Sequence, residues 1–221
     1  MKQSERNQDI QNIFEAAKAI ITNGHFVYAS GLHGDTYINK DAIYPHTAYV
    51  SKLCSYIAEE FIGKEVYAVI GPVVGGVALS QWTAHHLSLL MHKEVFALYA
   101  DKEEKSGETN FVIKRGQDKF ITNGKRILVV EDILTTGGSV KKVIEAVRMH
   151  NGTVVGVGAL CNRGQVTAED IGEVPVLRAL KNVTLQTYDM EKCPLCLRNV
   201  PINTTVGKGK EYLEKKGKKI E

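Results

Sequence analysis

Two adjacent carboxylates, followed by a run of glycine and hydroxyl residues, are the side chains of this sequence best suited to do chemistry. Glu131 and Asp132 come directly after the apolar, β-branched run 127–130, which is typical of a buried parallel strand. A helix with one apolar face is predicted to begin at Val140 and to end at Asn151–Gly152. The loop between the acids and this helix contains Thr135, Thr136, Gly137, Gly138 and Ser139.

This order of strand, acids, loop and helix predicts a site for ribose 5-phosphate. Glycines let the backbone approach an anion, and a helix N-terminus offers unpaired N–H groups and the positive end of a dipole. The carboxylates would repel a phosphate, but they can accept hydrogen bonds from ribose hydroxyl groups. The stretch contains neither the Gly-Lys-Ser/Thr of a Walker A loop nor a G-x-G-x-x-G fingerprint. An ordinary strand-to-helix turn with two solvated acids is the alternative.

Alternating helical and strand patterns indicate how these residues are positioned. Apolar periodicity predicts helices at 9–21, 48–61, 77–90 and 140–150, and strands at 66–70, 94–99, 127–130 and 153–161. We therefore expect an α/β fold, with a parallel central sheet flanked by helices and a small N-terminal flap. The alternation in residues 25–40 predicts that this flap consists of two short strands joined at Ser30–Gly31. The charged, non-periodic stretch 100–110 is predicted to form an exposed mobile loop.

The chain is expected to form one core with smaller parts at its ends. Residues 1–45 would form the N-terminal helix and the flap, residues 46–185 the core, and residues 186–221 a cysteine-containing segment with a lysine-rich tail. A hydrophobic share of 43% and a charged share of 24% over 221 residues are typical of a soluble globular protein. The net charge of +3 suits a small polyanionic substrate but does not indicate nucleic-acid binding. Because we find neither a membrane-length apolar run nor a signal-peptide core, we expect a cytoplasmic protein.

The stretch around the acidic pair resembles the signature of the type I phosphoribosyltransferases, which bind phosphoribosyl pyrophosphate (PRPP). The resemblance implies the fold of that family, carboxylates on the ribose hydroxyls, and Asp132 as a catalytic residue. It also implies that the loop 71–76, Gly-Pro-Val-Val-Gly-Gly, holds pyrophosphate, with a plain turn as the alternative. The implied PRPP-binding residues are Glu131, Asp132, Ile133, Leu134, Thr135, Thr136, Gly137, Gly138, Ser139, Val74, Gly75, Lys102 and Lys105.

Two further stretches are similar to the orotate phosphoribosyltransferases, in particular to a Thermus-like subgroup. Residues 26–39 resemble the F-x-L-x-S-G-x-x-S-x-x-Y flap that closes over the base in that family. The resemblance implies that Tyr37 and Ile38 cover the flat face of orotate and that Thr135 also contacts the base. Arg163, at the end of the strand 153–161, would hold the orotate carboxylate bidentately. The alternative for the flap is a surface hairpin with a packed tyrosine. The alternative for Arg163 is a solvated side chain.

The implied reaction transfers the phosphoribosyl group of PRPP to N1 of orotate, giving orotidine 5′-monophosphate and pyrophosphate in pyrimidine biosynthesis. Mg²⁺ would be carried mainly by PRPP. Lys102 and Lys105 would act as catalytic residues that close over the departing pyrophosphate. In this family the loop that carries such lysines commonly serves the neighbouring subunit, which implies a homodimer.

The resemblance has gaps at cationic positions. Asp101 and Gly107 stand where the family's mobile loop has an arginine and a histidine. Ala29, in the flap, and Gly75, in the loop 71–76, stand where the family has lysines. A purine phosphoribosyltransferase of the same fold and a non-catalytic regulator that senses PRPP therefore stay open as alternatives. The regulator is disfavoured because the N-terminal region contains no clear helix-turn-helix.

The pair Cys193-Pro-Leu-Cys196 has the spacing of a metal or redox site. A structural zinc site needs four ligands, and no second pair of this kind follows. Cys54 and Cys161 lie in apolar stretches and are predicted to be core residues. A zinc ion shared across a dimer, or completed by histidines such as His85 or His86, is one reading, and a packed turn is the other. We predict no metal site from the sequence.

Overall fold

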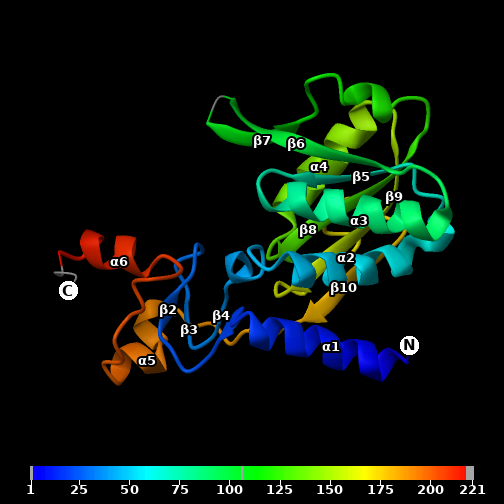
Figure 1. Ribbon diagram of the computed structural model, residues 1–221. Helices are drawn as coiled ribbons and strands as arrows, with labels where there is room; N and C mark the ends of the chain where they lie inside the picture. Colours follow the sequence, from blue (N-terminus) through cyan, green and yellow to red (C-terminus); the bar gives the residue numbers. More distant parts are fainter. Residues whose placement is uncertain (1, 106, 218–221) are drawn as a thin grey trace. The chain divides into compact units, whose positions relative to one another are not determined.

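The computed structural model describes residues 2–105 and 107–217 (Figure 1). The chain divides into two compact units, of which the first consists of Met1–Ile10 and His46–Val183. The second unit consists of Gln11–Pro45 and Thr184–Glu221. Helix α1 (Gln3–Ala16) runs from the first unit into the second. Residues 11–45 and the C-terminal stretch thus share one small unit, and the central region forms a larger one together with residues 1–10.

In the part of the first unit that the structure describes, six strands form one sheet in the order β10-β9-β8-β5-β6-β7. Neighbouring strands are parallel, except that β7 is antiparallel to β6. This arrangement confirms the predicted α/β fold with its parallel central sheet. The strands are β5 (Ala68–Pro72), β6 (Phe96–Lys105), β7 (Glu108–Val112), β8 (Arg126–Leu134), β9 (Thr153–Asn162) and β10 (Leu177–Asn182).

Helices cover both faces of this sheet. Helices α2 (Thr47–Phe61) and α3 (Gly75–Met91) lie on one face, and α4 (Gly138–Met149) lies on the other (Figure 1). The apolar run of β8 is fully buried because a central parallel strand is covered on both sides. Its alternate residues Ile127 and Val129 pack in one core cluster with Val140, Val143, Ile144 and Val147 of α4. This packing fixes the end of β8 against the start of α4.

The N-terminal helix begins and ends earlier in the chain than predicted, at Gln3 instead of residue 9 and at Ala16 instead of residue 21. Helix α1 ends at Ala16, whereas the apolar pattern predicted a helix that continues to Ile21. Lys18 has a left-handed backbone conformation (φ 53°), and Ile20–Ile21 form strand β1, antiparallel to β4 (Tyr37–Ile38). The prediction was wrong here because β-branched isoleucines suit a strand as well as the apolar face of a helix.

The charged stretch predicted as a mobile loop is a β-hairpin. Strand β6 continues to Lys105 and pairs with β7 from Glu108, so that prediction was wrong. Across the hairpin, the hydroxyl of Thr109 donates a hydrogen bond to the carboxylate of Glu104 at 2.7 Å. The hairpin forms the edge of the sheet, where charged side chains are usual in strands. Its sequence therefore lacks the apolar alternation that would have indicated a strand.

Among the described residues, the second unit contains two short antiparallel strand pairs, β1 with β4 and β2 (Phe26–Val27) with β3 (His33–Gly34). The β2–β3 pair confirms the predicted hairpin in the flap. Gly31, in the turn of this hairpin, has a φ of +83°, which glycine adopts without strain.

Backbone hydrogen bonds join this hairpin to the C-terminal stretch of the same unit. His33 and Tyr188 exchange two bonds of 2.9 Å, and the N–H of Asn203 donates to the carbonyl of His25 at 2.8 Å. The C-terminal stretch contains η4 (Met190–Lys192), α5 (Pro194–Leu197) and α6 (Gly209–Lys215). Residues 209–215 of the lysine-rich tail form a helix. The last four residues lie outside the described part of the chain. The remaining short helices are η1 (Lys40–Ala42), η2 (Ile62–Lys64) and η3 (Asp118–Phe120).

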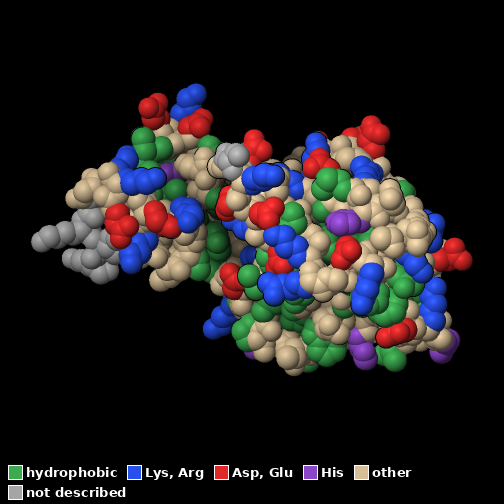
Figure 2. Space-filling view, turned by 90° about the horizontal axis from the view of Figure 1, so that it is seen from above, with side chains coloured by type: hydrophobic (Ala, Val, Ile, Leu, Met, Phe, Trp, Pro, Cys, Tyr) green, Lys and Arg blue, Asp and Glu red, His purple; other side chains and the backbone are tan. Residues whose placement is uncertain are grey.

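The surface shown in Figure 2 carries basic and acidic side chains side by side. Lys and Arg side chains lie among Asp and Glu side chains on this face, which agrees with the small net charge of +3. Within the described residues, none of the helices combines the length and the apolar character that a bilayer crossing requires.

Candidate active site

The loop between β8 and α4 lines a depression of about 130 Å³. The side chains of Thr135, Thr136 and Ser139 are exposed, so their hydroxyl groups are accessible to a ligand. The two acids precede this loop in β8, and the start of α4 follows it. The lining residues are Glu131, Ile133, Leu134, Thr135, Thr136, Gly137, Gly138, Ser139 and Val140.

Gly137 shapes the entry into α4. It is the N-cap residue with a φ of 75°, and a Cβ atom at this position would lie 2.5 Å from Cγ2 of Ile171. Glycine alone satisfies both the backbone conformation and the close approach. Gly137 has no side chain that could cap this helix end, and the N–H of Gly138 makes only a long hydrogen bond of 3.4 Å to Oγ1 of Thr136. The first N–H groups of α4 therefore face the loop and make this side of the depression electropositive.

Glu131 and Asp132 are buried, with 8% and 4% of their surface exposed. They were expected where the strand leaves the sheet, but β8 continues beyond them to Leu134. The backbone N–H of Asp132 donates to Oε1 of Glu131 at 3.0 Å, and the N–H of Ile133 donates to Oδ1 of Asp132 at 2.7 Å. These bonds orient both carboxylates, so the site has a negative part beside the positive start of α4.

Arg163 lies against the same loop. Its Nε donates a hydrogen bond to Oγ1 of Thr135 at 3.0 Å, and its backbone N–H donates to the carbonyl of Leu134 at 3.0 Å. A Cβ atom on Gly164 would lie 1.6 Å from the carbonyl oxygen of Thr135, so only glycine permits this approach. The structure thus brings together two of the residues predicted to contact the base.

The predicted pyrophosphate loop connects β5 to α3. Val74 is 85% exposed, and Gly75 is the first residue of α3. The peptide bond between Val73 and Val74 is cis. Because β5 is hydrogen-bonded in parallel to β8, the loops that follow these two strands emerge at the same edge of the sheet.

The predicted catalytic lysines lie on the edge hairpin. Lys102 and Lys105 belong to β6 and are exposed, and neither lines the depression at the β8–α4 loop. The ammonium group of Lys102 forms an ion pair with Oε1 of Glu104 at 3.0 Å. Lys142 of α4 donates a hydrogen bond to the carbonyl of Thr109 in β7, so the hairpin contacts the helix that follows the β8–α4 loop.

The predicted base-covering residues belong to the second unit. Tyr37 and Ile38 form β4, and the ring of Tyr37 lies 5.5 Å from the ring of Phe26. Ile38 is 2% exposed, and its backbone pairs with that of Ile20 in β1. Each of these two residues is therefore held by contacts within its own unit.

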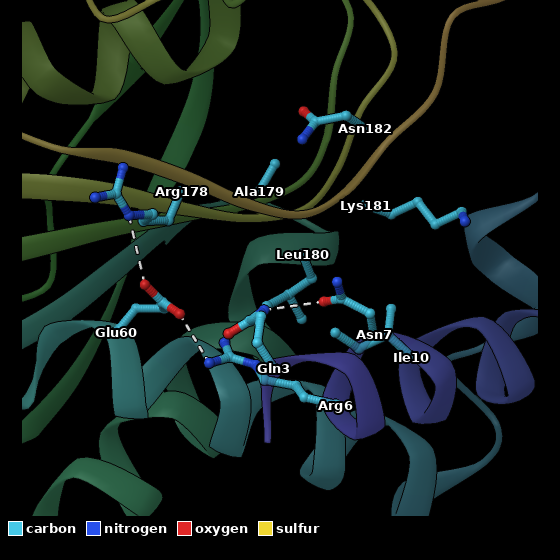
Figure 3. A pocket seen from close by; sticks show the side chains of 10 residues that line it. All are labelled: Gln3, Arg6, Asn7, Ile10, Glu60, Arg178, Ala179, Leu180, Lys181 and Asn182. Carbon is cyan, nitrogen blue, oxygen red and sulfur yellow. Dashed lines mark hydrogen bonds and ion pairs between the residues drawn. The ribbon is translucent and has the colours of Figure 1, made fainter. Parts of the chain in front are cut away.

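A larger depression of about 440 Å³ lies elsewhere in the first unit, along β10 and helices α1 and α2 (Figure 3). Its charged groups pair with one another. Nη1 of Arg6 lies 2.7 Å from Oε1 of Glu60, and Nε of Arg178 lies 3.4 Å from Oε2 of the same carboxylate. Despite its size, this depression holds none of the predicted site residues, so we place the active site at the β8–α4 loop.

Two histidines that the sequence did not indicate as ligands lie beside the cysteine pair. Cys193 and Cys196 lie beside His25 and His33 of the second unit. His85 and His86, which were considered as partners, belong to α3 of the first unit. The available signal was the placement of His25 and His33, one on either side of the predicted turn at Ser30–Gly31.

Comparisons with known proteins agree with this geometry. A family model described as "Phosphoribosyl transferase domain" matches residues 40–188. The chain is similar to the orotate phosphoribosyltransferase of Caldanaerobacter subterraneus subsp. tengcongensis, with 37% identity over 88% of this chain and 94% of the relative. It is 35% identical to the orotate phosphoribosyltransferase of a Thermoanaerobacter species, again over 88% of this chain and 94% of the relative.

Among solved structures, the chain resembles the crystal structure of orotate phosphoribosyltransferase from Aeropyrum pernix. The TM-score is 0.61 and the sequence identity 26%, over 79% of this chain and 93% of that chain. The residues matched by the family model, 40–188, include all six strands of the central sheet and the β8–α4 loop.

Proposed function

Because this chain belongs to the phosphoribosyltransferase family, we propose that it transfers the phosphoribosyl group of PRPP to orotate. The products are orotidine 5′-monophosphate and pyrophosphate, and the reaction is a step of pyrimidine biosynthesis. The relatives that support this assignment are orotate phosphoribosyltransferases that align over nearly their full length.

The observation that carries the choice of base is the contact between Arg163 and Thr135, at 3.0 Å. It holds a guanidinium group at the phosphate loop, next to the place where a base must meet the ribose. Orotate bears a carboxylate, which a guanidinium binds with two parallel hydrogen bonds. Purine bases bear no carboxylate that this cation could bind.

The acidic pair and the loop bind different parts of the ribose 5-phosphate. Glu131 and Asp132 accept hydrogen bonds from the ribose hydroxyls, and their own backbone contacts keep them oriented for this. The loop 135–139 holds the 5′-phosphate through its hydroxyls and N–H groups. Bond breaking at C1 of the ribose develops positive charge on the sugar, which the nearby carboxylates stabilise. The protein thus works mainly by positioning and electrostatics.

Pyrophosphate leaves from the opposite side of C1 as N1 of orotate forms the new bond. The backbone at Val74 and Gly75 binds the departing group, and Lys102 or Lys105 neutralises its charge when the hairpin moves over the site. The substrate is PRPP with its Mg²⁺, which prefers phosphate oxygens and few carboxylates and lowers the charge of the leaving group. The oriented carboxylates of Glu131 and Asp132 suit a ribose that carries such an ion.

Tyr37 would cover the flat face of the base and exclude water from the reacting atoms, whereas the side chain of Ile38 is 2% exposed and cannot cover it. We also propose a homodimer in which the edge hairpin serves the partner's site. Mixing an Asp132→Asn chain with a Lys102→Ala/Lys105→Ala chain tests this. Exchange of subunits should restore part of the activity, because one site of each mixed dimer then has all its groups. Mixtures that stay inactive would contradict the shared site.

The base is tested by the absorbance change of orotate in the presence of PRPP and Mg²⁺, with hypoxanthine, guanine and adenine run in parallel. We expect turnover of orotate only. Asp132→Asn should reduce kcat/KM by on the order of 10²-fold or more. Arg163→Ala should reduce kcat/KM for orotate by about 10- to 100-fold, the loss expected for a charge-assisted pair.

Matched controls lie on the exposed side of α4. Glu145→Gln and Arg148→Ala remove the same kinds of group at exposed positions and should leave kcat/KM unchanged. Turnover of a purine would contradict the assignment of orotate as the substrate, but not the membership of the chain in the phosphoribosyltransferase family. PRPP binding without turnover of any base would favour the PRPP-sensing regulator.

A further inference from the structure

The second unit brings four side chains with metal-binding atoms to one point. The side chains are those of His25, His33, Cys193 and Cys196, and one ligand atom of each lies within 4.8 Å of all the others. Nε2 of His25 lies 2.9 Å from Nδ1 of His33. Sγ of Cys196 lies 3.3 Å from Nδ1 of His33 and 3.6 Å from Nε2 of His25, and Sγ of Cys193 lies 3.8 Å from Nε2 of His25.

The sulfur–nitrogen separations match a tetrahedral zinc site, and the two ring nitrogens, 2.9 Å apart, would have to separate by about 0.5 Å to bind the same ion. Zinc binds cysteine sulfur at about 2.3 Å and histidine nitrogen at about 2.1 Å, which in a tetrahedron places sulfur and nitrogen about 3.6 Å apart. Three of the four sulfur–nitrogen distances of this cluster, 3.3, 3.6 and 3.8 Å, lie within about 0.3 Å of that value. Two thiolates with two imidazoles are a recurrent ligand set of structural zinc and, unlike carboxylates, do not suit Mg²⁺ or Ca²⁺.

The tautomer of His25 is set for metal binding. Its Nδ1 lies 2.8 Å from the carbonyl oxygen of Val200, which can only accept a hydrogen bond. The proton of a neutral His25 is therefore on Nδ1, and the lone pair of Nε2 points into the cluster. A backbone carbonyl that holds the second nitrogen of a ligand histidine is the usual arrangement at metal sites.

His33 is explained better by a metal ion than by a hydrogen bond to His25. Without a metal ion, Nδ1 of His33 would have to donate to Nε2 of His25, and Nε2 of His33 would be a buried acceptor. Among the described residues this Nε2 has no hydrogen-bond partner. With Nδ1 on a metal ion, Nε2 carries the proton instead. The ring stands nearly perpendicular to the ring of Tyr212, at 5.1 Å and 81°, a geometry in which an N–H can contact an aromatic face.

The ligands are buried and held in place by the backbone. His25, His33 and Cys193 are 2%, 0% and 0% exposed. The paired bonds between His33 and Tyr188, and the bond from Asn203 to His25, fix the hairpin against the C-terminal stretch that carries both cysteines. The four ligand atoms therefore converge without rearrangement of the chain.

We propose that His25, His33, Cys193 and Cys196 bind one Zn²⁺ ion as a structural site. All four tetrahedral positions are filled by protein, so no position is open for a substrate or an activated water. The ion joins the β2–β3 hairpin to the C-terminal stretch, which lie 160 or more positions apart in sequence. Folding units of fewer than roughly 80 residues often depend on such an ion because their apolar core is small. The site does not depend on the proposed transfer reaction.

The first experiment measures metal content of the full-length chain, freed of any affinity tag and kept in chelator-free buffer, by inductively coupled plasma mass spectrometry. We expect one zinc ion per chain. Cys193→Ser and Cys196→Ser should each lose most of it, and Cys54→Ser and His92→Gln, which change the same residue types elsewhere, should keep it. A folded wild-type chain without zinc, or with iron in its place, would overturn the proposal.

The second experiment needs no variant that could misfold. Titrating the thiols of the native wild-type chain with a mercurial, in the presence of a chromophoric chelator, should release one zinc ion as two thiols react. Replacing zinc by Co²⁺ should give the visible bands of a tetrahedral ion and a thiolate-to-cobalt charge-transfer band. Octahedral cobalt bands, or a Cys193–Cys196 disulfide in the freshly isolated folded chain, would show that the two cysteines are not thiolate ligands of a tetrahedral ion. Either result would contradict the proposal.

Discussion

The two units of this molecule are stabilised in different ways. In the first, β8 lies in the middle of a six-stranded sheet, and its residues 127–130 are completely buried between helices on both faces. In the second, each strand is two residues long, and the buried interior includes two histidines and a cysteine. Apolar burial is sufficient for the first unit. The second combines backbone contacts with the zinc site that we propose.

The difference teaches where each kind of site can arise. A site in the parallel sheet uses residues that are consecutive in sequence, since the end of one strand and the start of the next helix supply most of it. A site in the small unit uses residues from distant stretches, because the ion itself helps to hold those stretches together.

The largest effect should follow from removal of zinc. Native-state hydrogen exchange, followed by mass spectrometry with and without a chelator, should show that the amides of His33 and Tyr188 lose most of their protection, since structural zinc contributes on the order of 10 kcal/mol in small domains. The amides of β8 should lose less than about 0.5 kcal/mol of protection. Equal losses of amide protection in both units, or no loss in the second, would contradict the statement that the two units are stabilised in different ways.

The next effect comes from the core of the first unit. Leu128 is completely buried in β8, so Leu128→Ala should lower the free energy of unfolding by about 2–5 kcal/mol in urea titrations. Its zinc content should be that of the wild type. Leu89→Ala is the matched control, because Leu89 is 59% exposed and its truncation should change stability by less than about 0.5 kcal/mol. Loss of zinc in Leu128→Ala would mean that the two units do not fold independently.

The smallest effect concerns the cysteines. Burial raises the pKa of Cys54 and of Cys161, both in the first unit, from 9.0 to about 12. Each thiol therefore favours the folded state fully below pH 9, and this contribution is lost as the pH rises from about 9 towards 12, because only the unfolded state ionises in that range. At pH 8.5, iodoacetamide should leave both unlabelled in the native chain. It should label Cys193 and Cys196 once zinc is removed, and the reverse pattern would refute the assignment.

Much of the first unit could be predicted because its signals are local. The run 127–130, the acids and the glycine-hydroxyl loop are contiguous, and their order predicts strand, site and helix without knowledge of the rest of the chain. Arg163 could be included because it follows the next parallel strand, and such strands end at the same edge of a sheet. The edge hairpin could not, because charged side chains in β6 and β7 hide its alternation.

The metal ligands of the second unit could not be predicted in the same way. The spacing of Cys193 and Cys196 indicates a metal or redox pair, but spacing does not tell which other residues lie beside it. His25 and Cys193 are 168 positions apart. His25 directly precedes β2 and His33 begins β3, and strands of only two residues give a weak pattern. Their meeting depends on backbone pairing between the two ends of the chain, which no local pattern encodes.

The central claim is that the β8–α4 loop belongs to an enzyme that moves a phosphoribosyl group onto orotate. The most direct test supplies PRPP labelled in its 5′-phosphate, with Mg²⁺ and equal concentrations of orotate, hypoxanthine, guanine and adenine, and identifies the labelled product by chromatography. We predict that the label appears in orotidine 5′-monophosphate. Label in a purine nucleotide, or label that stays in bound PRPP, would contradict the claim.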